Sequence, residues 1–204
     1  MNRKEHWENV YRDNPADDVS WFQTRPALSL QLIAATGVSK QDGIIDVGGG
    51  ASVLVDWLLD EGFGRLAVLD ISGAALTCAR QRLGARAGKV MWLEADVTTF
   101  APPQRFAVWH DRAVFHFLTA AEDRAAYVRS LERTVPPGGH VIIATFAVDG
   151  PLKCSGLEVA RYDETSIRAQ IGPGFKFQSQ VNETHVTPWQ TEQKFSYFVF
   201  SRKP

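Results

Sequence analysis

A glycine-rich turn beside an acid is the first stretch of this chain where chemistry is expected. Asp46 lies near the end of the apolar run at 43–47, and three glycines, Gly48, Gly49 and Gly50, follow directly. An amphipathic stretch begins at 52. Glycines between a strand and a helix let a ligand contact the backbone, and the free N–H groups of the helix favour an anionic group. The neighbouring acid indicates that the ligand also has a cationic end.

Two kinds of ligand fit such a turn. A dinucleotide site needs a further glycine where this chain has Val53, and Asp46 would repel a pyrophosphate. S-adenosylmethionine carries an amino group, a carboxylate and a sulfonium, so it explains both the glycines and the acid.

The turn belongs to a regular alternation of strands and helices. Apolar runs predict five strands, at 43–47, 65–71, 89–97, 105–114 and 140–147, and helical spacing predicts helices at 52–62, 72–84 and 120–135. This alternation predicts an α/β fold, a Rossmann-like, mostly parallel sheet with helices on both faces. The tail holds two alternating aromatic-rich stretches, at 175–188 and 191–202, which predict a C-terminal antiparallel strand pair.

Further acids follow the predicted strands, namely Asp70, Asp96 and Asp111. Carboxyl ends of parallel strands are where open α/β sheets bind ligands. With the run from Ile44 to Ser52, this order of motifs resembles the class I S-adenosylmethionine-dependent methyltransferases. Their first motif is an apolar pair, an acid, an apolar residue and G-x-G-x-G, and Ser52 replaces its third glycine here.

The resemblance implies a role for each strand end. Asp70 would accept both ribose hydroxyls, Ile71 would lie against the adenine, and Asp96 would accept the adenine amine beside Val97. The methionine part would lie over Gly48 and Gly50. The full expected cofactor set is Trp21, Asp46, Gly48, Gly50, Asp70, Ile71, Asp96, Val97 and Asp111.

The chain is predicted to be one domain, 1–204, with an N-terminal helical lid segment (1–40) and a Rossmann-like core (41–204). The lid segment carries Trp7, Tyr11, Trp21 and Phe22, a heavy aromatic load outside the sheet. These side chains either cover the sheet or close over the cofactor, which would exclude water from the site.

The turn after the fourth strand carries the expected catalytic residues, Asp111, Arg112 and His116. An Asp111–Arg112 ion pair and a core histidine are the alternatives for these side chains. The turn resembles that of thiopurine- and chalcogen-methylating enzymes and, equally, that of small lysine-methylating enzymes, with Ala113 at their glycine. We expect methyl transfer to a small molecule, possibly a thiol or chalcogen. A protein lysine acceptor and a non-catalytic cofactor-binding protein are the alternatives.

Composition excludes several other functions. The net charge is −1 with no long run of like charge, which disfavours nucleic acid. No apolar stretch approaches the ~20 residues of a membrane span, and the N-terminus lacks a signal-peptide pattern. The two cysteines, Cys78 and Cys154, favour a reducing, cytoplasmic location. The histidines and cysteines show no metal-ligand spacing, so no metal is expected.

Overall fold

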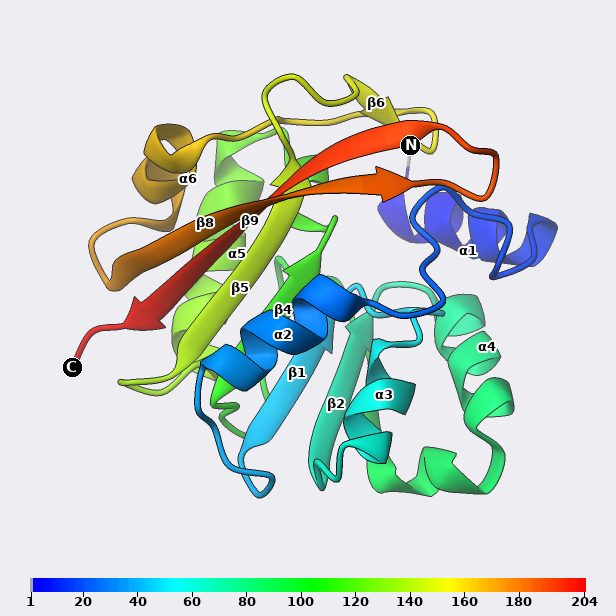
Figure 1. Cartoon of the computed structure of the whole chain (residues 1–204), viewed down its shortest axis with the longest axis horizontal. Coiled ribbons are helices and arrows are strands. Elements are labelled where there is room, and N and C mark those ends of the chain that lie inside the picture. Colours follow the sequence, from blue (N-terminus) through cyan, green and yellow to red (C-terminus); the bar gives the residue numbers. More distant parts are fainter. Residues whose placement is uncertain (1) are drawn as a thin grey trace.

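The computed structural model describes residues 2–204, and Met1 of the predicted lid segment lies outside them. Its centre is a seven-stranded sheet in the order β3-β2-β1-β4-β5-β9-β8 (Figure 1). The first five strands run parallel, whereas β9 is antiparallel to both β5 and β8. The predicted fold class is therefore confirmed. The strands are β1 (Gly43–Val47), β2 (Arg65–Asp70), β3 (Val90–Glu94), β4 (Val108–Arg112), β5 (His140–Phe146), β8 (Phe175–Val186) and β9 (Glu192–Arg202).

Strand order reverses between β1 and β4, which lie side by side at the centre of the sheet. The chain runs outward from β1 through β2 to β3 and then returns to β4 on the other side. Such a switch point leaves a crevice at the carboxyl ends of the strands. The glycine turn follows β1, and the turn with Arg112 and Ala113 follows β4, so both lie at this crevice.

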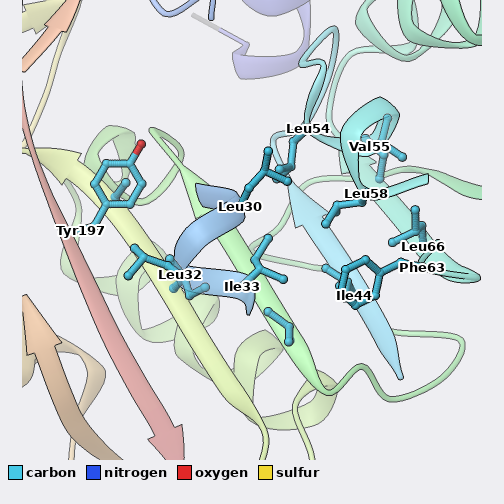
Figure 2. Packing of buried hydrophobic residues seen from close by; sticks show 14 of the residues in the cluster. Leu30, Leu32, Ile33, Ile44, Leu54, Val55, Leu58, Phe63, Leu66 and Tyr197 are labelled. Carbon is cyan, nitrogen blue, oxygen red and sulfur yellow. The ribbon is translucent and has the colours of Figure 1, made fainter. Parts of the chain in front are cut away.

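Helices cover both faces of the sheet because successive side chains of a strand point to opposite faces. In Figure 1, α2 (Ala27–Ala35) and α3 (Leu54–Asp60) lie in front of the sheet, and α5 (Ala121–Thr134) lies behind it. Figure 2 shows Leu30, Ile33 and Leu58 of the front helices packed over Ile44 of β1. The next residue, Ile45, belongs to the core on the opposite face. Leu76 and Leu83 of α4 (Gly73–Leu83) extend the front core, while α6 (Glu164–Ile171) adds to the rear one.

The N-terminal helix α1 (Arg3–Asp13) lies against α4 rather than on the sheet (Figure 1). None of its residues is buried, and polar contacts help to hold it. The Glu8 carboxylate accepts the backbone N–H groups of Gly73, at 2.7 Å, and Ala74, at 3.2 Å, which are otherwise unpaired at the start of α4. Arg3 binds Asp96 and Asp123, and Lys4 binds Glu94.

The elements differ from expectation mainly at their ends. β3 ends at Glu94 and β4 spans Val108–Arg112, so both are shorter than predicted, and Asp96 lies beyond its strand. Helix α2 lies within the segment 1–40 that was predicted to be helical, although its bounds were not predicted. Helix α6 and the short strands β6 (Lys153–Cys154) and β7 (Leu157–Glu158) were not predicted. Two 3₁₀ helices, η1 (Gly84–Lys89) and η2 (Phe115–Phe117), complete the fold. Among residues 2–204, no helix has the length and apolar character needed to cross a membrane.

Candidate active site

A cavity lies at the carboxyl ends of β1, β2 and β4, beneath α1. Its wall combines three parts of the chain: the N-terminal segment, the strand ends with the turns that follow them, and β6. The lining residues are Arg3, Trp7, Tyr11, Trp21, Val47, Gly48, Leu69, Asp70, Ile71, Ala95, Asp96, Val97, Arg112, Ala113, Val114, Phe117, Leu118 and Cys154. A second hollow lies on the other side of the glycine turn, under residues 16–26, and shares Tyr11, Trp21, Gly48 and Arg112 with the first.

The chain's own side chains fill the space that each glycine of the turn leaves. A Cβ on Gly48, whose φ is +65°, would lie 1.9 Å from Cγ2 of Val114. A Cβ on Gly49 would lie 2.5 Å from Oδ2 of Asp46, and one on Gly50 would lie 2.7 Å from Oδ2 of Asp70. The glycines therefore serve the packing of the turn as well as the approach of a ligand.

Asp70 is a buried carboxyl at the end of β2 that lines the cavity. Its Oδ1 accepts the Ser72 N–H at 2.8 Å. Burial, opposed by the hydrogen bond from Ser72 and aided by the charges of Asp46 and Glu8, raises the pKa of Asp70 to about 7. No ion pair to Asp70 occurs within residues 2–204, so this carboxyl is suited to a ligand that donates hydrogen bonds.

The predicted adenine residues gather at the same end of the cavity. Ile71, Asp96 and Val97 all line it. Oδ1 of Asp96 accepts the N–H of Thr98 at 2.8 Å, so this aspartate also caps its own turn. Its Oδ2 faces Nη1 of Arg3 at 3.4 Å.

Asp46 lies on the other side of the glycine turn and has a partner that the sequence did not reveal. Its Oδ1 lies 2.7 Å from Nδ1 of His110 on β4, and Nε2 of His110 lies 2.9 Å from Oγ of Ser29 on α2. All three side chains are buried, and all three line the second hollow. Asp46 and His110 are directly paired in the sheet, which is why they meet.

Asp111 is not part of the cavity wall, and this corrects the expectation that it contacts cofactor or substrate. Its carboxylate accepts the N–H groups of Val114, at 2.8 Å, and Phe115, at 3.2 Å, and the hydroxyl of Tyr127 at 2.6 Å. Burial raises its pKa to about 6 despite these hydrogen bonds. Asp111 therefore fixes the turn after β4 from the face that carries α5.

Arg112 lines both hollows, but it does not pair with Asp111 as the alternative held. Its Nε donates to the hydroxyl of Tyr197 at 2.9 Å, its Nη1 donates to the carbonyl of Trp21 at 3.0 Å, and its Nη2 lies 3.7 Å from Glu183. The guanidinium also lies 4.5 Å from the ring centre of Phe195. Nη2 is buried and has no hydrogen-bond partner among the described residues.

His116 is a core histidine, and it does not line the cavity. Its Nδ1 accepts the N–H of Phe146 at 3.4 Å, which leaves the proton of the neutral ring on Nε2. Burial, with the charge of Arg112, lowers its pKa to about 3. The structure therefore supports the structural alternative and corrects the expectation that His116 takes a proton.

Aromatic side chains form another part of the cavity wall. Trp7 makes edge contacts with Phe117, at 5.0 Å between ring centres, and with Trp21, at 5.8 Å. Cys154 of β6 completes this wall, and burial raises the pKa of its thiol to about 11. Arg3, Trp7 and Tyr11 bring α1 into the cavity, as the lid prediction requires.

Among residues 2–204, no group of three or more histidine, cysteine or acidic side chains is arranged to hold a metal ion.

Comparison with known proteins shows what this chain resembles. Residues 44–139 match the family described as a methyltransferase domain. The N-methyltransferase NodS from Bradyrhizobium japonicum, solved with S-adenosyl-L-homocysteine, is similar with a TM-score of 0.71 at 18% identity, over 97% of this chain and 98% of NodS. A structure concerning the conversion of a disulfide bond into a thioacetal group during echinomycin biosynthesis is similar with a TM-score of 0.78 at 20% identity, over 99% of this chain and 92% of that one.

A curated relative is similar in sequence. The chain is 22% identical, over 199 residues, to the eEF1A lysine and N-terminal methyltransferase of Mus musculus. That match includes 97% of this chain but 28% of the mouse protein, so the chain spans little more than a quarter of its relative's length.

Residues 44–139 match a methyltransferase domain, and the strand order and the motifs at the strand ends agree with the class I S-adenosylmethionine-dependent methyltransferases that the sequence resembles. The cofactor of that class is S-adenosylmethionine. The residues present fit this molecule: Asp70, a buried carboxyl that has no cationic partner among residues 2–204, faces the cavity, and Gly48 leaves the backbone bare beside it.

Proposed function

We propose that this enzyme transfers the methyl group of S-adenosylmethionine to a small thiol or related chalcogen compound. In this proposal Asp70 binds the ribose hydroxyls, and Ile71, Asp96 and Val97 hold the adenine. The methionine part lies over Gly48 and Gly50. This arrangement directs the methyl group toward the aromatic wall formed by Trp7, Trp21, Phe117 and Cys154.

One observation carries the choice of acceptor: Arg112, whose Nη2 lies 3.7 Å from Glu183, is a cationic side chain in the cavity wall beside the aromatic residues. The cavity's acids, Asp70 and Asp96, lie at the adenine end. A guanidinium repels an ammonium group and attracts an anion. It therefore favours a thiolate, or an acceptor with an anionic substituent, over a lysine side chain.

Proton chemistry supports the same choice. Neither His116, with a pKa of about 3, nor Asp111, which is fully hydrogen-bonded, is available as a base at this end. A thiol has a pKa near ~8.5, so part of it is already thiolate at neutral pH, whereas a lysine amine near ~10.4 must first lose a proton.

The reaction is a direct displacement. The acceptor sulfur forms a bond to the methyl carbon as the bond from that carbon to the sulfonium breaks, and the products are a thioether and S-adenosylhomocysteine. The thiol proton leaves to solvent before this step. Alignment of the reacting atoms supplies most of the catalysis, and such orientation contributes roughly 7–11 kcal/mol.

A protein amine is the second candidate, because the chain is similar to a lysine and N-terminal methyltransferase. Methyl-labelled cofactor distinguishes the two. The labelled cofactor is supplied with a panel of small thiols and selenols, and separately with the protein fraction of a cell extract, between pH 7 and 9. We expect thiol labelling that rises with the thiolate fraction. Labelling of a protein band without any thiol turnover would overturn the proposal, and release of no S-adenosylhomocysteine with any fraction would favour a non-catalytic binder.

A further inference from the structure

We propose that His110 is a positioning residue that holds Asp46 for the amino group of the cofactor, and that Ser29 in turn holds His110. The inference rests on the proposed placement of the methionine part over Gly48 and Gly50. It assigns a role to two side chains that lie outside the first cavity and outside the motifs of the sequence.

The three side chains form one continuous hydrogen-bonded chain. Asp46 comes from β1, His110 from the neighbouring strand β4, and Ser29 from helix α2, which packs over both (Figure 1). Their exposed fractions are 4%, 2% and 0%. Buried polar groups that satisfy one another in this way have one geometry, since any displacement leaves a group unpaired.

Donors and acceptors can be assigned along this chain. A carboxylate only accepts, so Nδ1 of His110 carries a proton and donates to Oδ1 of Asp46 at 2.7 Å. When the ring carries only this proton, Nε2 accepts a hydrogen bond from the hydroxyl of Ser29 at 2.9 Å. Ser29 thereby selects the tautomer that Asp46 needs.

This arrangement leaves the second oxygen of Asp46 for a ligand. Oδ2 lies beside Gly49, 2.5 Å from where a Cβ would stand, so only glycine leaves room for it. By holding Oδ1, His110 fixes the orientation of the Asp46 carboxylate. A buried, oriented carboxylate of this kind matches an ammonium group at the glycine turn.

The test uses calorimetry to compare the binding of two ligands that share the adenosine of the cofactor. S-adenosylhomocysteine has the amino group, whereas 5′-methylthioadenosine has the same adenosine and sulfur but lacks the amino-acid part. We expect His110→Ala to weaken binding of the first by about tenfold or more, the effect of a charge-assisted hydrogen bond, and to leave the second within about twofold. His110→Asn, which retains a donor, should recover part of the loss.

Further variants make the outcome decisive. Ser29→Ala should show the same selective loss, to a smaller extent, and it serves if His110→Ala does not fold. In Asp46→Asn, the added change His110→Ala should have no further effect on the difference between the two ligands. Equal weakening of both ligands in the His110 and Ser29 variants would show a merely structural role and overturn the inference. If Asp46→Asn itself weakens neither ligand selectively, the placement of the methionine part in the proposed function fails instead.

Discussion

The charge of Asp70 is expected to control how tightly the cofactor binds as pH changes. This carboxyl is 7% exposed, has no cationic partner in the described chain, and has a pKa raised to about 7 by burial. Ribose hydroxyls donate to a carboxylate, and hydrogen bonds to the charged form lower its pKa. Cofactor binding and loss of the Asp70 proton therefore favour each other.

The size of the effect follows from linkage. If the pKa falls well below 6 in the complex, the apparent dissociation constant for S-adenosylhomocysteine should be roughly tenfold larger at pH 6 than at pH 8. The free protein should show the opposite trend in stability. Because the folded pKa is raised from 3.8 to about 7, the folded state holds the Asp70 proton more tightly, and stability falls as pH rises through that window, by on the order of 4 kcal/mol.

Calorimetry at pH 6, 7 and 8, in buffers of different ionisation enthalpy, measures both the affinity and the protons released. We expect close to half a proton released at pH 7 by the native protein and none from Asp70→Asn, which should also bind more weakly at pH 8. Asp60→Asn, a change to an exposed acid of α3, is the matched control and should behave as the native protein. An affinity that does not change between pH 6 and 8, or the same pH dependence in Asp70→Asn, would refute the reasoning.

Three further outcomes are expected. Residues 3–13 should exchange amide hydrogens more slowly when S-adenosylhomocysteine is bound, because α1 lines the cavity; unchanged exchange in mass spectrometry would refute a lid. Gly48→Ala should lower the free energy of unfolding, measured with urea, by about 2–4 kcal/mol, because the new Cβ combines a positive φ with overlap onto Val114. Gly37→Ala is the control, with φ +74° and no atom within 4 Å of the new Cβ, and should lower it by about 1–2 kcal/mol. Equal losses in the two variants would contradict the overlap. Ala113 has a φ of +73°, so Ala113→Gly should leave stability within about 1 kcal/mol, and Ala113→Val should lower it by more than about 2 kcal/mol; a stable valine variant would contradict that backbone conformation.

Most of the fold could be predicted from the sequence because its strands and helices are marked by local sequence patterns. Buried parallel strands give continuous apolar runs, and capping residues mark where helices begin and end: Ser72 accepts the N–H of Ala75, and Gly84 ends α4. The bounds of α2 were not predicted because its apolar residues mark no single helix face and because it has no side-chain cap. The helix α6 had a usable signal, the capping box of Asp163 and Ser166.

The site could be predicted only in part, because its main contacts join residues that are far apart in the sequence. Asp46 and His110 are 64 residues apart, and Ser29 is 81 residues from His110. Their only shared sequence signal is position, since Asp46 and His110 occupy equivalent places near the ends of two strands that the fold makes neighbours. Likewise, Glu183 rather than the adjacent acid pairs with Arg112, because β8 approaches from the far end of the sequence.

The acids near the ends of β1, β2 and β4 occupy similar positions in the sequence. Their roles differ because the side chains and backbone groups around them differ. Asp111 accepts three hydrogen bonds from its own chain, so it acts on the cavity through shape: by holding the N–H of Val114 it places that side chain against Gly48. Asp46 has one oxygen taken by His110 and one beside the turn. Asp70 alone of the three faces the first cavity, without a cation, so its charge is the one that a bound ligand must stabilise.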